Sequence, residues 1–367
     1  MKRLLLSGYY GYGNAGDEAV LAGLVTGFRT ARSAREMAVG ELEIVALSGR
    51  PAETTAAHGI AAADRYKPGA LLREIHRADL VLSGGGSLLQ DVTSAHGIFY
   101  YLGVVRMAQI LGRKTMFIAQ GIGPLHLARS RRLVRSVADR LNAVTVRDPD
   151  SAALLRAVGV TRPPIEVTAD PALLLGGPAP AADGTASFGV ALRPWQGQEG
   201  LAVHVADACL SVLSGRRALL LPMQPQTDKP VAEQFARQWH QGDQVRNRAT
   251  LCSLEKGLTP LLSNIAACEL MIGMRLHALI LAAAAGVPSV ALSYDPKVDA
   301  FMQGSGQGDA VYDLARPDPD VLQSLLTRVW AERAGRAAAL RAALPALRAR
   351  ATRNVDVALA LLQAGGV

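Results

Sequence analysis

The segment from Met271 to Lys297 constrains the fold most strongly. It contains a short apolar strand, a turn, an Ala/Leu-rich helix that ends at Gly286, and a second apolar strand. Two strands joined by a helix form a βαβ unit, which requires a parallel sheet covered by helices. Arg275 and His277 lie in the turn, where the free N–H groups of the helix favour an anion. A capping arginine and a core histidine would give the same pattern.

The same alternation of apolar strands and helices extends over most of the 367 residues. It predicts an α/β fold with two doubly wound Rossmann-like domains, residues 1–175 and 187–316, joined by a linker at 176–186. An Ala/Arg/Leu-rich helical tail follows at 317–367. We expect the tail to break at Pro345 and its last helix to cross back to the first domain. Two such domains facing across a cleft are the GT-B-like architecture of many glycosyltransferases and epimerases, although a fold does not determine a function.

The net positive charge of the chain has two explanations. The sequence has 39 basic and 31 acidic residues, a net charge of +8, and nearly all of its basic residues are arginines. An arginine-for-lysine bias would explain this, as would an anionic ligand or membrane surface. One helix is particularly basic, and it forms either a solvated face or a membrane-contacting one. Its arginines are Arg129, Arg131, Arg132, Arg135 and Arg140.

Several classes of partner are not expected. No basic run is interleaved with aromatic residues, which argues against nucleic acid. No apolar run reaches 18 residues, so no membrane span is expected. Cys209, Cys252 and Cys268 are far apart and in apolar contexts, which indicates reduced thiols in the cytoplasm. We also find no cluster with metal-ligand spacing and therefore expect no metal.

Two glycine-rich loops follow strands in the first half. The loop after the strand Arg3–Ser7 leads into a helix at 18–29, but its glycines do not match the dinucleotide fingerprint. Asp17 and Glu18 would also repel a pyrophosphate, and each can cap the helix or act on a hydroxyl as a base or acceptor. Three consecutive glycines at 84–86 leave bare backbone, against which a ligand or the opposite domain can pack.

Seven short segments resemble, in this order, the polysaccharide pyruvyl transferase family, and most closely its cell-surface polysaccharide branch. The segments are Gly11–Glu18, Ser83–Asp91, Gln120–Pro124, Thr145–Asp148, Asp170–Pro171, Gly273–Ala278 and Tyr294–Val298. The resemblance extends to about residue 315, and the helical tail matches no motif.

The resemblance implies phosphoenolpyruvate as the donor substrate, no further cofactor, and a pyruvate ketal across two hydroxyls of a sugar as the product. The acceptor it implies is a lipid-linked unit of a secondary cell-wall polymer of the kind that anchors S-layers, such as an N-acetylmannosamine unit. It also implies a cytoplasmic enzyme that can contact the inner membrane face. It does not indicate an oligomeric state. The segment Arg275-Leu276-His277 is placed at the donor by the same resemblance.

The chemistry of the reaction suggests roles for the donor-side residues. Phosphoenolpyruvate carries a phosphate and a carboxylate, which arginines bind in a bidentate manner, so Arg275, Arg193 and Arg147 are candidates. The first step protonates the methylene carbon and needs an acid that titrates near neutrality, for which His277 is the best candidate. Lys297 either holds phosphate or pairs with Asp299.

On the acceptor side, we expect Asp17 to accept the proton of the attacking hydroxyl and Asn14 to orient the sugar. Further acceptor candidates come from the first two motif segments. They are Glu18, Gly85, Gly86, Gln90 and Asp91. The donor is expected on the second domain and the acceptor on the first, with closure of the cleft expelling water.

Two other functions fit the sequence. A nucleotide-sugar-dependent glycosyltransferase of the same architecture could hold a diphosphate with Arg275-Leu276-His277, but the binding of the base would be unexplained. Such an enzyme would release a nucleotide diphosphate, whereas a pyruvyl transferase releases phosphate. A non-catalytic sugar-binding protein is the other alternative, and it would not need Arg275 or His277 for its role.

Overall fold

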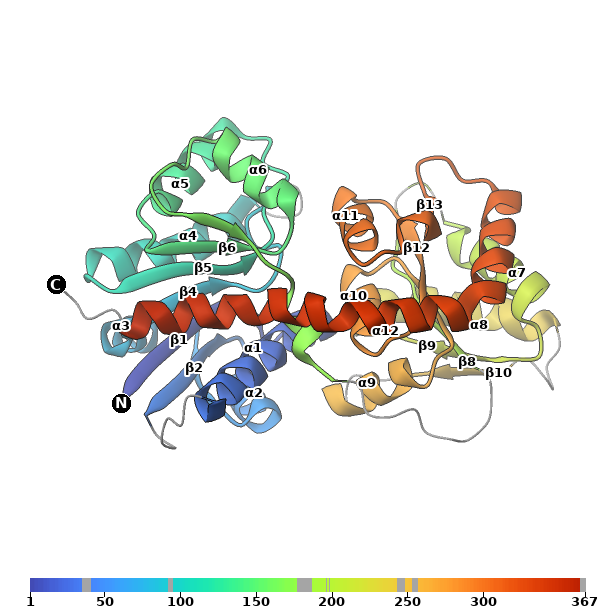
Figure 1. The fold of residues 1–367 in the computed structure, drawn as a ribbon, viewed down its shortest axis with the longest axis horizontal. Coiled ribbons are helices and arrows are strands. Elements are labelled where there is room, and N and C mark those ends of the chain that lie inside the picture. Colours follow the sequence, from blue (N-terminus) through green and yellow to red (C-terminus); the bar gives the residue numbers. More distant parts are fainter. Residues whose placement is uncertain are drawn as a thin grey trace. The chain divides into compact units, whose positions relative to one another are not determined.

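The computed structural model describes residues 1–34, 41–91, 95–176, 187–195, 197, 199–242, 248–252 and 257–363. The described chain forms two compact units, each built on its own sheet (Figure 1). The first unit comprises Met1–Tyr12, Asp17–Leu174 and the end of the chain from Arg348, and the second comprises Gly13–Gly16 and Leu175–Leu347. All but the first residue of the predicted linker at 176–186 lies outside the described residues.

The first unit contains a seven-stranded parallel sheet in the order β3-β2-β1-β4-β5-β6-β7. Its strands are β1 (Lys2–Tyr10), β2 (Leu42–Ser48), β3 (Ala61–Asp64), β4 (Leu80–Gly84), β5 (Lys114–Gln120), β6 (Ala143–Val146) and β7 (Ile165–Val167). Its helices are α1 (Ala15–Ala34), α2 (Pro51–His58), α3 (Pro68–Arg77), α4 (Ala95–Ile110), α5 (Ala128–Ala138), α6 (Pro149–Ala157) and the 3-10 helix η1 (Pro171–Leu174). The strand order reverses between β1 and β4, where open α/β sheets bind ligands at the carboxyl ends of the strands.

The second unit repeats this plan with six parallel strands in the order β10-β9-β8-β11-β12-β13. Its strands are β8 (Ser187–Ala191), β9 (Arg217–Leu220), β10 (Arg248–Leu251), β11 (Leu270–Gly273), β12 (Ser289–Ser293) and β13 (Val311–Asp313). Its helices are α7 (Leu201–Leu213), α8 (Pro225–Gly242), α9 (Leu258–Ala266), α10 (Leu276–Ala284), α11 (Pro296–Gly304) and the 3-10 helix η3 (Gly308–Ala310). Here the order reverses between β8 and β11. The predicted α/β fold class is confirmed.

Burial on both faces explains why the central strands are apolar without interruption. Leu4 and Leu6 of β1 belong to one buried cluster, whereas Leu5 between them belongs to another. Successive side chains of a strand point to opposite faces, and helices cover both faces of this sheet, so each position must be apolar.

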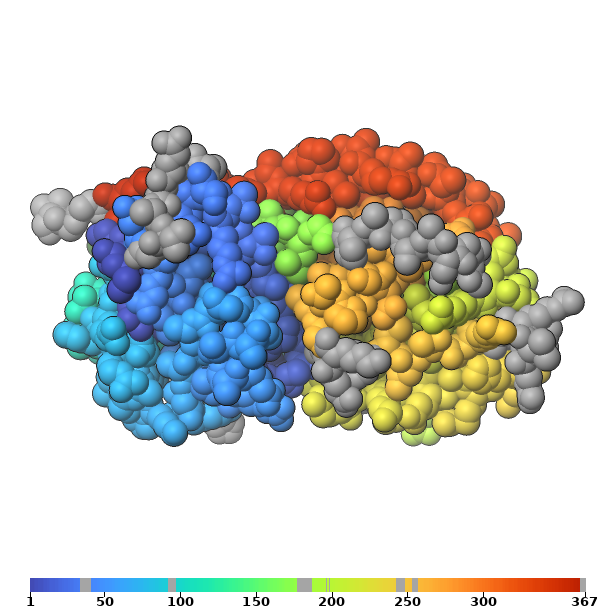
Figure 2. Space-filling view, turned by 90° about the horizontal axis from the view of Figure 1, so that it is seen from below, coloured from blue at the N-terminus to red at the C-terminus, as the bar shows by residue number. Residues whose placement is uncertain are grey.

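The C-terminal tail is a single helix, α12 (Pro319–Gln363), as Figure 1 shows. Pro345 lies inside this helix. The predicted break at Pro345 is therefore wrong. An internal proline removes one helical hydrogen bond, but packing on both sides of it outweighs this loss. Leu344 and Leu347 are buried, and further along Val355 and Leu359 pack in the core of the first unit. Figure 2 shows the atoms of α12, in red, at the molecular surface.

Asn354 fixes the last part of α12 within the first unit. Its amide donates to the carbonyl of Ala169 at 2.9 Å, and its side-chain oxygen accepts from Thr145 and Thr168 at 2.7 and 2.8 Å. Asn354 is fully buried, so these bonds replace water completely. Within the ranges described above, no helix has the length and hydropathy that crossing a membrane requires.

Candidate functional site

Arg275 occupies the N-cap position of α10, directly after β11. Its Nε donates to Asp228 Oδ2 at 3.0 Å, and its Nη2 donates to Asp228 Oδ1 in a still closer contact. The carboxylate is fully buried, whereas the arginine side chain is 17% exposed. This bidentate pair holds the guanidinium in one orientation at the carboxyl end of the sheet.

Asp228 is a site residue that the sequence reasoning missed. It lies in the first turn of α8 and also accepts from Gln224 N and Thr227 Oγ1, both at 2.9 Å. Thr227 Oγ1 in turn accepts from Arg275 Nη2 at 3.2 Å. An acidic residue in a first helical turn is common, so only the spatial neighbourhood of Arg275 gives Asp228 its role.

Residues Gly13–Gly16 follow β1 in the chain but belong to the second unit. Ala15 N donates to the carbonyl of Met223 at 2.8 Å, and Gly16 N donates to Asn14 Oδ1 at 2.9 Å. A methyl group added to Gly16 would collide with the imidazole ring of His277. The structure therefore brings Asn14 and Gly16 together with the Arg275-Leu276-His277 motif, and the division of the chain differs from the predicted 1–175 at these residues.

Arg193 follows β8, the strand beside β11. Because Ala191 pairs with Gly273, Arg193 and Arg275 stand two residues beyond matched positions of neighbouring strands. Arg193 Nη1 donates to the Tyr294 hydroxyl at 3.1 Å, and its guanidinium lies 5.2 Å from the centre of that ring. Trp195 packs on the same ring at 4.6 Å.

Among the residues that the structure describes, no carboxylate forms an ion pair with Arg193. Its Nε is buried and has no hydrogen-bond partner within the same residues. The Tyr294 ring and hydroxyl hold the side chain without neutralising its charge, which suits an anion.

Lys297 lies in the first turn of α11, where its backbone N–H donates to the N-cap residue Asp295 at 3.0 Å. Asp299 is two residues further along the same helix and is exposed. Side chains two apart on a helix do not face each other, so the geometry does not favour the Asp299 pairing. Lys297 stays a predicted phosphate ligand.

The three consecutive glycines after β4 are covered by α1 of the same unit. A Cβ atom on Gly86 would lie 2.9 Å from Asp17 Oδ1, and one on Gly85 would collide with Val20. This packing partner, α1 of the same unit, was not among those expected from the sequence, and acceptor binding by Gly85 and Gly86 stays a prediction. The glycines instead allow the first turn of α1, with Asp17, to approach the backbone closely.

Glu18 and Asp91 form hydrogen bonds inside the first unit. Glu18 accepts from Gly11 N and contacts His58 Nε2, both at 2.8 Å. Asp91 accepts from His126 N and Leu127 N at 2.8 and 2.9 Å. Burial alone would raise the pKa of Asp91, but these hydrogen bonds outweigh it and lower that pKa. These contacts favour structural roles, and Gln90, which precedes Asp91, shares this loop.

Arg147 is buried in the first unit and connects three of the motif segments. Its Nη1 donates to Asp170 Oδ2 at 2.8 Å, and its Nη2 donates to Ser87 Oγ at 2.7 Å. This arrangement satisfies a buried charge and favours a role in holding the loops together. Arg147 was predicted as a donor ligand beside Arg275 and Arg193, but those two residues belong to the second unit.

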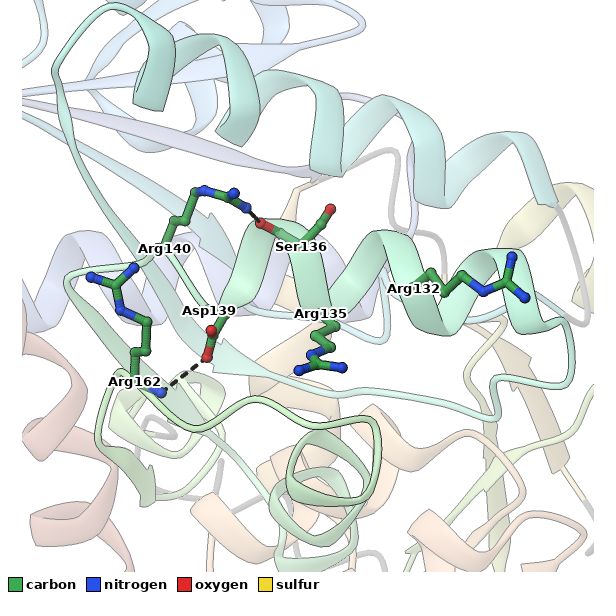
Figure 3. Close-up of a pocket in the computed structure, with 6 residues that line it drawn as sticks. All are labelled: Arg132, Arg135, Ser136, Asp139, Arg140 and Arg162. Carbon is green, nitrogen blue, oxygen red and sulfur yellow. Dashed lines mark hydrogen bonds between the residues drawn. The ribbon is translucent and has the colours of Figure 1, made fainter.

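The basic helix α5 lines a surface pocket of about 320 Å³ in the first unit (Figure 3). The residues around it are Arg132, Arg135, Ser136, Asp139, Arg140 and Arg162. Asp139 accepts from the backbone N–H groups of Thr161 and Arg162 at 2.8 and 2.9 Å. The lining includes four arginines and one aspartate, so the pocket carries a net positive charge. Among the described residues, no group of three or more His, Cys, Asp or Glu side chains could hold a metal ion.

Solved structures share the fold of the whole chain. Anabaena HepE in complex with UDP and glucose has 14% identity and a TM-score of 0.62, and the alignment covers 98% of this chain and 100% of HepE. A putative UDP-N-acetylglucosamine 2-epimerase from Listeria monocytogenes has 13% identity, a TM-score of 0.67 and coverage of 98% and 96%. Sucrose-phosphate synthase from Thermosynechococcus elongatus has 13% identity, a TM-score of 0.62 and full coverage of both chains.

These likenesses establish a GT-B-like fold and do not by themselves give an activity. No curated protein sequence matches the chain significantly. The model of the family named polysaccharide pyruvyl transferase matches residues 14–296, which include the segments around Asn14, Arg147, Arg275 and His277. The chain belongs to the polysaccharide pyruvyl transferase family.

Proposed function

We propose that the protein transfers the enolpyruvyl group of phosphoenolpyruvate to two hydroxyls of a cell-wall sugar, forming a pyruvate ketal and releasing phosphate. The observation that carries this proposal is the arrangement of the second unit, where Arg275 is fixed by Asp228 beside His277. Arg193 follows β8, the strand next to β11, and no carboxylate of the described residues pairs with it. Membership of the family supports the class of reaction.

The donor carries a phosphate and a carboxylate, and the cluster offers groups that match both. Arg193 supplies an unneutralised guanidinium for one anionic group. Arg275 mainly orients the donor through its fixed guanidinium, because Asp228 already balances much of its charge. Helix α10 begins directly after Arg275, and its N-terminus adds free backbone N–H groups. Lys297, at the N-terminus of α11, is the further candidate for the phosphate.

The reaction begins when His277 donates a proton to the methylene carbon of phosphoenolpyruvate, which makes C2 an oxocarbenium-like electrophile. The first sugar hydroxyl attacks C2 and loses its proton to a base, for which Asp17 is the candidate. Phosphate leaves with its bonding electrons, and a second oxocarbenium-like centre forms. The second hydroxyl attacks this centre, loses its proton and closes the ketal.

The direct test is to incubate the protein with phosphoenolpyruvate and a lipid-linked N-acetylmannosamine acceptor. We expect phosphate release to equal the amount of ketal found by mass spectrometry of the sugar. Omission of the acceptor should abolish release, and Arg193→Gln should raise the KM for phosphoenolpyruvate. The proposal is wrong if no amino-sugar acceptor supports phosphate release.

A nucleotide-sugar-dependent glycosyltransferase is the second candidate. It is favoured by the fold shared with Anabaena HepE, whose structure contains UDP and glucose. The N-terminus of α10 with Arg275 suits a diphosphate as well as a phosphate. Replacing phosphoenolpyruvate with UDP-sugars in the same assay separates the two, because this reaction would release UDP. If Arg275→Ala and His277→Ala leave pathway function intact, a non-catalytic sugar-binding role would replace both.

The proposed acceptor is lipid-linked, and the arginine pocket on α5 supports a further part of the proposal. Arginines at the surface are attracted to anionic lipid headgroups, and this attraction falls off over about one Debye length. We therefore propose that the cytoplasmic enzyme binds its acceptor while it is in peripheral contact with an anionic membrane face.

A further inference from the structure

Six of the eight tyrosines of the chain gather in the first unit around one arginine, Arg65. They are Tyr9, Tyr10, Tyr12, Tyr66, Tyr100 and Tyr101. The Arg65 guanidinium lies 4.2 Å from the ring centre of Tyr100 and 5.3 to 6.0 Å from those of Tyr101, Tyr12 and Tyr66. Aromatic residues make up only 5% of the sequence, so their concentration at one place calls for an explanation.

The cluster stands at the carboxyl end of the sheet. Tyr9 and Tyr10 end β1, and Arg65 directly follows β3. In a doubly wound sheet, this end is where ligands bind. Asp17, the candidate base, is close to the cluster: a Cβ atom on Gly85 would lie 3.5 Å from the Tyr10 hydroxyl, and one on the adjacent Gly86 would lie 2.9 Å from Asp17 Oδ1. Burial raises the pKa of Tyr9, and the charge of the Asp17 carboxylate raises it further.

Arg65 is only 6% exposed and acts as the centre of the cluster. Its Nη1 donates to the carbonyl of Gly8 at 2.8 Å, and in the described part of the chain no carboxylate pairs with it. The ring faces around it therefore balance a buried charge through cation–π contacts. This fixes the inner tyrosines, Tyr10 and Tyr101, which are buried.

The outer tyrosines are not explained by the need to hold Arg65. Tyr66 is 66% exposed, and its hydroxyl forms a short hydrogen bond with that of Tyr12. Tyr12 and Tyr9 stack with ring centres 4.2 Å apart and an interplanar angle of 15°. A Cβ atom on Gly49 would lie only 2.9 Å from the Tyr12 ring, so the glycine lets this ring approach the backbone.

A partly exposed array of tyrosine rings and hydroxyls is suited to a carbohydrate. A pyranose presents C–H groups on its faces, which pack on aromatic rings, and hydroxyls at its edge, which bond to tyrosine hydroxyls. We propose that Tyr9, Tyr12 and Tyr66, here called the tyrosine platform, form the subsite that binds the acceptor saccharide beside Asp17. This inference rests on the proposed function, because it assigns the acceptor of that reaction.

The test compares Tyr66→Ala and Tyr66→Phe with the unmodified protein. Tyr66 is exposed, so neither change should impair folding. In the pyruvyl transfer assay, we expect Tyr66→Ala to raise the KM for the acceptor about tenfold, the scale of one aromatic contact, with the KM for phosphoenolpyruvate unchanged. Tyr66→Phe should give a smaller rise, because it keeps the ring and loses only the hydroxyl.

Phe99→Ala is the matched control, since Phe99 is an aromatic residue of the same unit that is 45% exposed and outside the platform. Binding of a soluble N-acetylmannosamine glycoside, followed by saturation-transfer NMR, gives a readout that needs no catalysis. The platform is refuted if Tyr66→Ala keeps both the acceptor KM and the glycoside signal of the unmodified protein. If no phosphate is released but the glycoside signal disappears in Tyr66→Ala, the proposed reaction fails while the saccharide subsite stands.

Discussion

At the level of single residues, two arginines that look alike in the sequence, Arg147 and Arg193, have different surroundings in the two units. Arg147 is held by Asp170 and Ser87, whereas Arg193 is held by Tyr294, and no carboxylate in the described part of the chain pairs with it. Both arginines follow strands, so their positions in the chain do not distinguish them. The difference depends on whether a carboxylate from another segment reaches the guanidinium.

Asp228→Asn should test whether the orientation of Arg275 matters. The change leaves a largely buried guanidinium without its counter-charge, so we expect a loss of about 3 kcal/mol in the free energy of unfolding. We also expect a raised KM for phosphoenolpyruvate. Glu166→Gln, which removes the exposed pair with Arg353, should cost less than about 1 kcal/mol in denaturant titrations. Equal stability of the two variants would argue against the buried pair.

Gly16→Ala should impair activity through His277. The added methyl group would collide with the imidazole, so either the ring or the start of α1 must move. We expect kcat to fall about tenfold or more, since small misplacements of a reacting group have large effects. Gly69→Ala is the matched control, because Gly69 is also the second residue of its helix and its Cβ would meet nothing within 4 Å. Unchanged kcat in Gly16→Ala would remove His277 from the proposed role.

Asp91 should make the stability of the folded protein depend on pH in the acidic range. Its pKa is lowered in the folded protein, so its contribution is fully present above the unfolded value of about 3.9. The contribution is lost as the pH falls below that value toward the folded pKa. We expect the difference in Tm between the unmodified protein and Asp91→Asn to shrink between pH 6 and pH 3. A constant difference over this range would contradict the hydrogen bonds to His126 and Leu127.

At the scale of elements, the sequence predicted the alternating strands and helices because burial on both sheet faces makes each strand apolar along its whole length. It also located Arg275 and His277, since strand ends and helix starts can be recognised locally. The pairing of Asp228 with Arg275 and the tyrosine platform were missed because each brings together residues that are distant in the chain. The continuity of α12 through Pro345 was missed for the same reason, since packing from other elements overrides a local helix breaker.

The last part of α12 offers an element-scale prediction. Asn354→Ala would leave the buried Thr145 hydroxyl and the Ala169 carbonyl with fewer partners, so we expect a loss of about 2 kcal/mol in the free energy of unfolding. Gln323→Ala, at an exposed position of the same helix, should change it by less than about 0.5 kcal/mol. Thermal unfolding of both variants checks this, and a neutral Asn354→Ala would show that the helix does not depend on that network.

At the scale of the whole molecule, the net charge of +8 leaves open which surface meets an anionic partner. The pocket on α5 is lined by four arginines and a single carboxylate. Arg132 and Arg135 are both exposed, and in the described residues neither forms an ion pair. If the protein contacts an anionic membrane, this concentration of charge identifies the contacting face.

Vesicle co-sedimentation tests that face directly. Each arginine near an anionic bilayer contributes about 1 kcal/mol, so the double change Arg132→Gln and Arg135→Gln should weaken binding to phosphatidylglycerol vesicles by about thirtyfold. The double change Arg77→Gln and Arg237→Gln removes the same charge from exposed positions on α3 and α8 and should have little effect. Vesicles of neutral phosphatidylcholine should bind neither variant, and high salt should release the unmodified protein. Equal weakening by both double changes would show that net charge, rather than the α5 pocket, attracts the protein to the membrane.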